Sequence, residues 1–459
     1  MSIFSAIFNR SVASYEEAFQ ASDITSEQMK TAISEWFDLY FQKTPTEQED
    51  PCQQIPYTIV HKLTKTAFSE YKAAGKDDFV QKVLAALDQK RKKAMQMSLI
   101  GGESYIKPIP STDGFCFGVI NRLNMMVFGR DNEGNATDIG TFEHSVRNTN
   151  YYSLLERRTV DPKGFLTIRN MLYCSDTRDT LGKRVPLSSH PAYAELPEEY
   201  VFPSPIGSIG MARLRTPMEN CVDGTEDAVS VYAPAVGLIH NINRNEAQLN
   251  GEFERGESRI VTSADMLRKK VETTVGVQTL TLKDHVFVGL DEDPETVGIN
   301  IFSPALREQS FLARKQDYLR SAESIIGLKR GLLSEVEATE RTAKEITSSE
   351  GDYNLTIIDF QQAWEDAARE TVRLCGILGQ MYHITGAHEA NSDDAVTFDW
   401  GNGVLFDEEK TWADMKDQVA KGLLKPEIAV GWRYGMPTET PEDLQKVRER
   451  YMPEIEAVE

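Results

Sequence analysis

Hydrophobic positions at helical spacing dominate the first hundred residues. Thr25 and Gln28 have the spacing of a capping box, in which two side chains satisfy backbone groups at a helix start. The apolar residues that follow fall on one helical face: Ile33, Trp36, Phe37, Tyr40 and Phe41. The same periodicity predicts two further helices, near 56–73 and 78–98, and the pair Gly101-Gly102 ends the last of them.

The pattern changes to short β-prone runs between residue 101 and about residue 200. Polar turns separate these runs, which are FCFGVI (115–120), MMVFG (125–129), NYYSLLERR (150–158) and FLTIRNMLYC (165–174). The last two runs flank the turn at 161–164 and therefore predict an antiparallel hairpin. This part of the chain is expected to be rich in strands.

The stretch 226–255 combines helical periodicity with a narrow apolar stripe. Thr225 is the expected N-cap and Gly256 the expected stop. Pro234 either kinks this helix or marks its true beginning. The stripe consists of Val229, Tyr232, Val236, Ile239, Ile242, Leu249 and Phe253. Its polar flanks include Asn241, Arg244, Asn245 and Gln248, which indicates a helix that packs against a neighbour tolerant of polar groups.

A small β module and a second long helix follow. The runs SRIVT, VQTLTL, HVFVGL and GINIF predict strands within 257–302, and the acidic stretch at 291–293 followed by Pro294 predicts a turn. Ser303 as N-cap and Pro304 at the first helical position then predict a helix that runs to about Leu328. Its expected buried face consists of Leu312, Leu319, Ala322 and Ile326.

A charged connection over 329–351 leads to the most apolar helix of the chain. Asp352 is the expected cap of this core helix, which covers about 353–385 and carries a wide apolar stripe. AVTFDWG (395–401) predicts a strand. Short helices are expected at the C-terminal end, opened by Thr411 with Asp414, by Pro426 and by Thr440.

The charge balance limits the function classes. The chain has 459 residues and a net charge of −21, so a protein that grips nucleic acid tightly is disfavoured, because such binding depends on Lys and Arg. The five cysteines form no CxxC pair, which argues against a zinc site and a disulfide framework. We read neither a signal peptide nor an apolar run of membrane-spanning length.

No catalytic, cofactor or metal motif emerges from the residues. Gly75-Lys76 lacks the remaining glycine and the hydroxyl residue of a phosphate-binding loop, and Gly401-Asn402-Gly403 lacks the third glycine of a dinucleotide fingerprint. His383 and His388 are five residues apart and do not share a helix face. Acidic pairs are expected by chance among 71 acidic residues. We therefore expect no enzyme activity, no cofactor and no metal.

The order of these elements resembles that of the portal proteins of tailed bacteriophages, of the siphophage type. The likeness rests on three stretches: LIGGESYIKP (99–108), DGTEDAVSVYAPAVGLIHNINRNEAQLNGEFERGESRIV (223–261) and RTAKEITSSEGDYNLTI (341–357). It implies an α+β, elongated subunit that assembles into a ring, usually of twelve copies, at one capsid vertex. DNA enters and leaves the capsid through the channel of such a ring.

The resemblance also implies a division of the chain into regions. These are a wing (1–225), a stem helix (226–255), a clip (256–302), a second stem helix (303–326), a tunnel loop with the long wing helix (327–410), and a short helical crown (411–459). The candidate channel residues are Lys329, Arg330, Glu335, Glu337, Glu340, Arg341 and Lys344. The stem candidates are Asn241, Arg244, Asn245 and Gln248, and the clip candidates are Arg259, Asp291, Glu292 and Asp293. A mostly acidic or neutral channel lining is expected to let the DNA duplex pass.

The partners implied by the resemblance are other copies of the chain, a terminase motor, a head-completion or adaptor protein, and the major capsid and scaffolding proteins. Double-stranded DNA would pass without sequence specificity and without a membrane being involved. The expected location is the portal vertex of the virion, after assembly in the cytoplasm of a bacterial host. The alternatives are another structural virion protein, such as a minor capsid or scaffold component, a cytosolic enzyme with an acidic catalytic pair, and a tight DNA-binding module.

Overall fold

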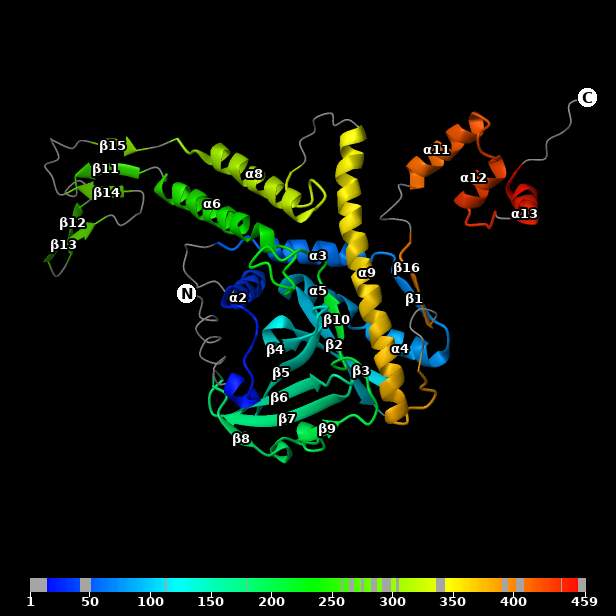
Figure 1. Ribbon diagram of the computed structural model, residues 1–459. Coiled ribbons are helices and arrows are strands. Elements are labelled where there is room, and N and C mark those ends of the chain that lie inside the picture. The colour runs from blue at the N-terminus through cyan, green and yellow to red at the C-terminus, as the bar shows by residue number, and fades with distance from the viewer. Residues whose placement is uncertain are drawn as a thin grey trace, which may run out of the picture.

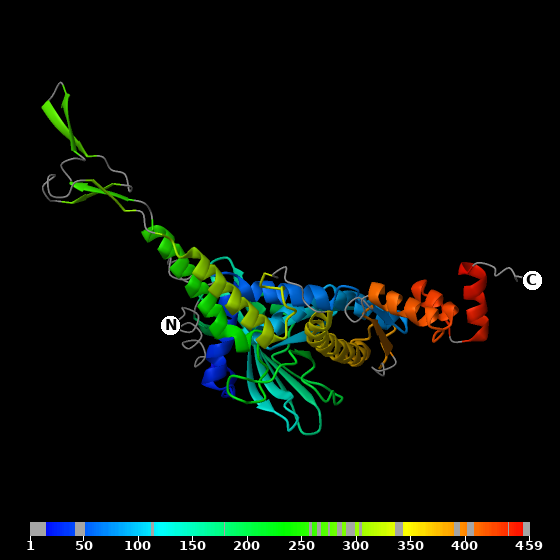
Figure 2. The ribbon, with the colours of Figure 1, turned by 90° about the horizontal axis from the view of Figure 1, so that it is seen from above.

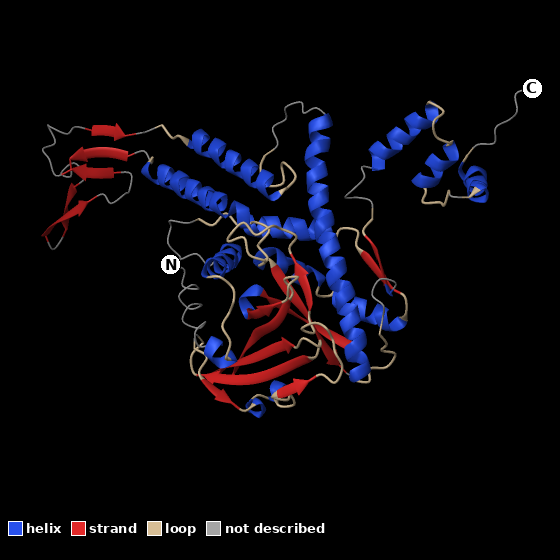
Figure 3. Ribbon diagram, viewed as in Figure 1, coloured by secondary structure: helices blue, strands red, loops and turns tan. Residues whose placement is uncertain are grey.

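The computed structural model combines helices and strands in one elongated chain (Figures 1 and 3). A two-helix hairpin with a small β module at its far end projects from a mixed α and β body, and three short helices lie at the opposite end of the molecule (Figure 2). The structure describes residues 15–41, 51–111, 114–178, 180–256, 259–263, 268–273, 276–281, 287–290, 299–302, 305–335, 343–389, 395–401, 408–438 and 440–452.

The largest sheet has six strands joined in antiparallel pairs. It consists of β4 (Met125–Arg130), β5 (Ala136–Arg147), β6 (Asn150–Val160), β7 (Leu166–Ser175), β8 (Lys183–Val185) and β9 (Glu199–Val201). The predicted hairpin is confirmed, because β6 pairs antiparallel with β7 over ten register positions from Tyr151↔Ser175 to Val160↔Leu166. β5, which none of the predicted β-prone runs contains, pairs with both β4 and β6.

Helices and a smaller sheet enclose the main hydrophobic core. The smaller sheet has the order β10 (Ala212–Arg215), β2 (Glu103–Ser111) and β3 (Gly114–Asn121). The helices are α2 (Glu27–Phe41), α3 (Ile55–Ala67), α4 (Asp78–Asp88), α5 (Arg91–Gly101) and α9 (Ala343–Met381). Trp36 of α2 and Trp364 of α9 are among the largest fully buried side chains of this core.

Three N-terminal predictions need correction. The expected helix over 78–98 is two helices, because the chain turns at Gln89 and Lys90 between α4 and α5. The α3 helix ends at Ala67 rather than near 73. The α2 helix is capped by Ser26, whose hydroxyl accepts the backbone N–H of Met29 at 3.1 Å. The hydroxyl of Thr25 accepts from Arg122 instead, so Thr25 and Gln28 form no capping box.

The first helix of the two-helix hairpin is shorter than the helix predicted over 226–255. A 3-10 turn, η4 (Ala233–Ala235), contains Pro234 and precedes α6 (Val236–Arg255). The alternative in which Pro234 marks the beginning of the helical segment is therefore correct, and Thr225 caps no helix. Residues 226–232 run without helical structure, and the N–H of Val231 donates to the carbonyl of Leu99 at 3.0 Å. With 20 residues, α6 is about 30 Å long.

The β module beyond α6 contains two small sheets. Its strands are β11 (Arg259–Ser263), β12 (Arg268–Thr273), β13 (Gly276–Thr281), β14 (Phe287–Leu290) and β15 (Ile299–Phe302). The order is β14-β11-β15 in one sheet and β12-β13 in the other. The four predicted strands are present, and the basic strand β12 is an addition.

The second helix of the hairpin is α8 (Glu308–Ile326). It begins later than predicted, and the expected cap at Ser303 and Pro304 lies outside the described residues. Leu319, Ala322 and Ile326 are buried as predicted, whereas Leu312 is 50% exposed. The expectation of one continuous buried stripe on this helix is therefore wrong at Leu312.

The C-terminal part also departs from its predicted boundaries. The α9 helix has 39 residues and begins nine residues before Asp352, which is therefore no cap. The strand β16 (Val396–Asp399) pairs antiparallel with β1 (Lys72–Gly75), a strand that the periodicity did not indicate. The short helices are α11 (Glu408–Ala420), α12 (Pro426–Arg433) and α13 (Pro441–Tyr451). Thr411 lies within α11 rather than before its first residue, so it is not in the N-cap position. The hydroxyl of Thr440 accepts the N–H of Asp443 as predicted.

Candidate functional site

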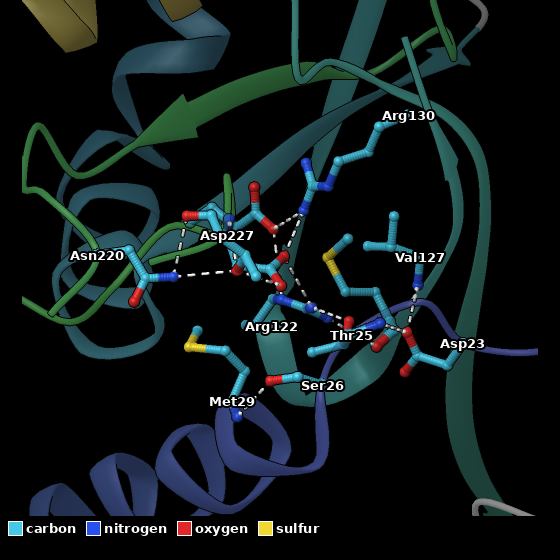
Figure 4. A network of polar contacts seen from close by, with 12 residues as sticks. Asp23, Thr25, Ser26, Met29, Arg122, Val127, Arg130, Asn220 and Asp227 are labelled. Atoms are coloured by element: carbon cyan, nitrogen blue, oxygen red, sulfur yellow. Dashed lines mark hydrogen bonds and ion pairs between the residues drawn. The ribbon is translucent and has the colours of Figure 1, made fainter. Parts of the chain in front are cut away.

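A network of buried charges anchors the segment that leads into α6 (Figure 4). Asp227 contacts two arginines, with its Oδ1 2.6 Å from Nη2 of Arg130 and 3.7 Å from Nη2 of Arg122. Arg122 in turn donates to Thr25 at the start of α2, at 2.7 Å. One charge cluster thus connects the start of α2, strand β4 of the six-stranded sheet and the segment that contains Asp227.

Glu103, which begins β2, lies at the centre of this cluster and is fully buried. Its carboxylate is 2.7 Å from Nε of Arg213, 3.3 Å from Nε of Arg122 and 3.9 Å from Nη2 of Arg130. Burial alone would raise the pKa of Glu103, but the three guanidinium charges outweigh it and lower the pKa to about 2. Glu103 therefore stays ionised at neutral pH, and its contacts with the three arginines help to hold the base of the hairpin in place.

The hairpin is fixed to the body along one side. The imidazole Nε2 of His240 lies 2.7 Å from Oε1 of Glu35 on α2. The N–H of Gln53 donates to Oδ1 of Asn243, and the side chain of Gln53 accepts from Lys315 on α8. Both helices of the hairpin are thus tied to residues near the start of α3.

The two helices also contact each other directly. The amide of Asn245 donates to the carbonyl of Phe311 at 3.0 Å. Near the β module, Arg307 forms a two-point ion pair with Glu252 at 2.9 and 2.7 Å. Lys315 donates to Glu246 at 2.8 Å. These contacts set the relative position of α6 and α8.

An open groove of about 580 Å³ lies between α6 and α8. Its lining residues are Asn241, Arg244, Asn245, Gln248, Arg307, Ser310, Phe311, Arg314 and Tyr318. We call this feature the arginine groove. Three of the lining residues are arginines, and none is acidic. Since guanidinium groups bind carboxylates and phosphates at two points, the groove has the chemistry of an anion-binding surface.

The structure brings together all four predicted stem residues in the arginine groove. The groove residues on α8 were not predicted, because only the apolar stripe of that helix was considered. Its signal was present in the spacing of Arg307, Phe311, Arg314 and Tyr318, which recur every three or four residues.

The connection after α8 folds back along that helix. Gly327 takes a left-handed conformation with φ of 77°, and the N–H of Glu335 then donates to Oε1 of Gln316 at 2.9 Å. The buried carboxylate of Glu323 accepts the N–H and the hydroxyl of Ser334 at 2.9 and 2.8 Å, together with the N–H of Leu333. Residues 327–335 thus form a strap that is fastened to α8.

The strap contains three of the predicted channel residues, and all three are exposed: Lys329, Arg330 and Glu335. Glu337, Glu340 and Arg341 lie outside the described residues, as do Asp291, Glu292 and Asp293 of the predicted clip. Lys344 is in the first turn of α9 and Arg259 begins β11, with only their backbone described. Among the described candidates, Lys329, Arg330 and Glu335 lie on the strap and Arg259 lies on β11 of the β module.

Replacing Glu323 with glutamine should loosen the strap. An amide group keeps the size but removes one acceptor oxygen, so a buried donor of residues 333–334 loses its partner, at a cost of about 1–3 kcal/mol. We expect amide hydrogen exchange at residues 332–335 to accelerate about tenfold or more. Asp317→Asn, on the exposed side of α8, is the matched control. Unchanged exchange in the Glu323 variant would show that its carboxylate does not hold the strap.

Other kinds of site are not found in the part of the chain that the structure describes. No group of three His, Cys, Asp or Glu side chains there is arranged to hold a metal ion. None of the helices traced there has the length and apolar character needed to span a membrane.

No protein-family model and no curated protein matches the chain. Among solved structures, it is similar to a chain of the neck of a native GTA particle computed with C12 symmetry, at 11% identity and a TM-score of 0.43, covering 91% of this chain and 96% of that chain. A chain of the neck of an empty GTA particle computed with C6 symmetry aligns at 11% identity and a TM-score of 0.41, covering 90% of this chain and 94% of that chain. Similarity at this level does not define a function.

Proposed function

We propose that this chain is the portal protein of a tailed bacteriophage, which assembles as a ring around a channel for double-stranded DNA. The observation that carries the proposal is the projecting pair of helices, α6 and α8, with a β module at its far end and a strap that leads to the 39-residue α9 (Figures 1 and 2). This order of elements matches the stem, clip, tunnel loop and wing helix that the sequence resemblance implies.

The exposure of the hairpin supports assembly with other copies. A pair of helices gains most of its stability from packing an apolar face, yet Leu312 of α8 and Phe253 of α6 are 50% and 44% exposed in the single subunit. Apolar side chains of this size on a projecting element indicate a surface that a neighbour covers. Repeated side-by-side contacts of this kind close into a ring when each subunit is rotated by a fixed angle.

The acidity of the chain fits a channel through which DNA slides. Tight binding of a duplex requires many Lys and Arg contacts with phosphates, and the net charge here is −21. In the proposal, the strap and the connection after it reach the narrowest part of the channel. The β module receives the terminase motor and then the head-completion proteins, while the wing contacts capsid and scaffolding proteins.

Electron microscopy of the purified chain tests this function. Class averages should show a ring of about twelve subunits with an open central channel. Rings without a channel, or only irregular oligomers, would favour the alternative of another structural virion component. Isolated globular particles at every concentration would contradict both.

A further inference from the structure

The arginine groove faces away from the body of its own subunit. On α6, Asn243 contacts Gln53 of the body. Arg244 and Glu246 are two residues apart, so they point about 200° from each other around the helix. Glu246 lies on the side where Lys315 joins Gln53, and Arg244 lines the groove. A ligand of the groove must therefore approach from outside the subunit body.

The described residues leave two of the three groove arginines without a carboxylate partner. Arg314 donates to the hydroxyl of Tyr318 and lies over its ring, and among the described residues neither Arg314 nor Arg244 forms an ion pair. Arg307 is the one lining arginine paired with a carboxylate, that of Glu252. In a chain with 71 acidic and 50 basic residues, two groove arginines that pair with no carboxylate of the described residues favour an anionic partner outside the subunit.

A surface of this charge cannot pair with itself. In a two-fold symmetric dimer the groove of one copy would meet the groove of the other, and like charges would oppose each other. A contact between copies through this groove must therefore use a second, different surface. Such head-to-tail contacts produce rings or open filaments.

The opposite edge of α8 has the complementary character. Glu308 and Leu312 are four residues apart and share one face of the helix, and Leu312 points about 200° around the helix from Arg314 of the groove. Leu312 is half exposed, and Glu308 has no ion pair among the described residues. This edge combines an apolar side chain with a carboxylate, and the groove combines two aromatic rings with arginines.

We propose that the arginine groove of one subunit receives the Glu308–Leu312 edge of α8 from a second copy. Leu312 packs against Phe311 and Tyr318 of the neighbour, and the carboxylate of Glu308 pairs with its Arg314 or Arg244. This contact rests on the proposed ring and specifies the surfaces that form it.

Phosphates of DNA are the other anion that arginines could bind. A groove that held the duplex would oppose sliding, and it would leave Leu312 without cover. The second copy accounts for both the charge and the exposed leucine, so the observations favour it.

A disulfide experiment tests the pairing directly. Ser310 lines the groove and Leu312 marks the edge, and their side chains point about 200° apart on α8, so cysteines at both positions of one chain cannot join. The double variant Ser310→Cys with Leu312→Cys should give a ladder of covalent oligomers under mild oxidation, in steps of 51.6 kDa. Each single variant, and the natural chain with its own five cysteines, is the control for background linkage.

A charge exchange provides the second measurement. Arg314→Glu and Glu308→Arg should each shift the chain from rings to monomers, at least tenfold in the concentration needed for assembly. The double variant should recover assembly, because every contact then pairs a mutated groove with a mutated edge. Arg147→Glu, on an exposed end of β5, applies the same change in charge elsewhere and should leave assembly unchanged.

The outcomes separate the contact from the function. Rings that form normally in all charge variants and give no ladder would overturn the contact and leave the portal function standing. If no form of the chain makes rings, both fail. If Arg314→Glu leaves ring mass unchanged but lowers retention on immobilised duplex DNA, the groove binds phosphate and the proposed contact is wrong.

Discussion

Replacing Glu103 with glutamine should lower the free energy of unfolding by about 3–5 kcal/mol at neutral pH. The fully buried carboxylate of Glu103 faces the guanidinium groups of Arg213, Arg122 and Arg130. In the glutamine variant this negative charge is lost, and within the cluster only Asp227 is left to balance the arginines. Uncompensated buried charge is among the most costly defects in a folded protein. Urea unfolding followed by circular dichroism measures the change.

The pH dependence of this contribution has a definite sign. The pKa of Glu103 falls from 4.5 to about 2 on folding, so its stabilising effect is fully present above pH 4.5 and is lost as the pH falls toward 2. A shift of this size corresponds to about 3 kcal/mol. The difference in stability between the natural chain and Glu103→Gln should therefore shrink across that acidic range.

Glu199→Gln is the matched control for this prediction. Glu199 pairs with Arg169 at 3.3 Å on the exposed side of the large sheet, where an ion pair contributes less than about 1 kcal/mol. If Glu103→Gln proves as mild as this control, the charge cluster does not secure the base of the hairpin.

Truncating Trp364 to alanine should destabilise the chain by about 3–5 kcal/mol. The indole is fully buried in the middle of α9, and its Nε1 donates to the hydroxyl of Tyr71 at 3.1 Å. Its ring meets that of Phe68 edge to face, at 5.4 Å between centroids. The change would leave a cavity where α9 packs on the body, and thermal unfolding measures the result.

Leu355→Ala on the same helix is the control for Trp364. Leu355 is 61% exposed in the subunit, so its truncation should change the stability of the monomer by no more than about 0.5 kcal/mol. Equal effects at the two positions would mean that the apolar stripe of α9 is not the core contact described here.

Long segments with a wide apolar stripe could be predicted from the sequence alone. Ile357, Phe360 and Trp364 of the α9 stripe are buried as their spacing indicates. On α2, Ile33, Trp36 and Phe37 are buried as predicted, whereas Phe41 at the end of the helix is 46% exposed. The helix predicted over 226–232 is wrong, because Val229 and Tyr232 have helical spacing but are buried in a segment without helical structure. That segment is held by a contact with Leu99, more than a hundred residues away, which no local pattern can reveal.

For a similar reason, only the α6 half of the arginine groove could be predicted from the sequence. The polar flank of α6 could be recognised because the apolar stripe of that helix is narrow. Arg314 and Tyr318 of α8 become part of the groove only because the two helices pack side by side. The strap is also held by the buried carboxylate of Glu323, whose hydrogen-bond partners lie ten and eleven residues further on. Partners of this kind are set by tertiary packing rather than by spacing.

The central claim is that the projecting hairpins of many copies line up around a hollow axis. Light scattering of the purified chain measures this most directly, because it reports the mass of the assembly in solution. We expect a species near 620 kDa, about twelve copies of a 51.6 kDa chain. A mass that stays at 51.6 kDa at every concentration, and also after recovery from assembled particles, would contradict it.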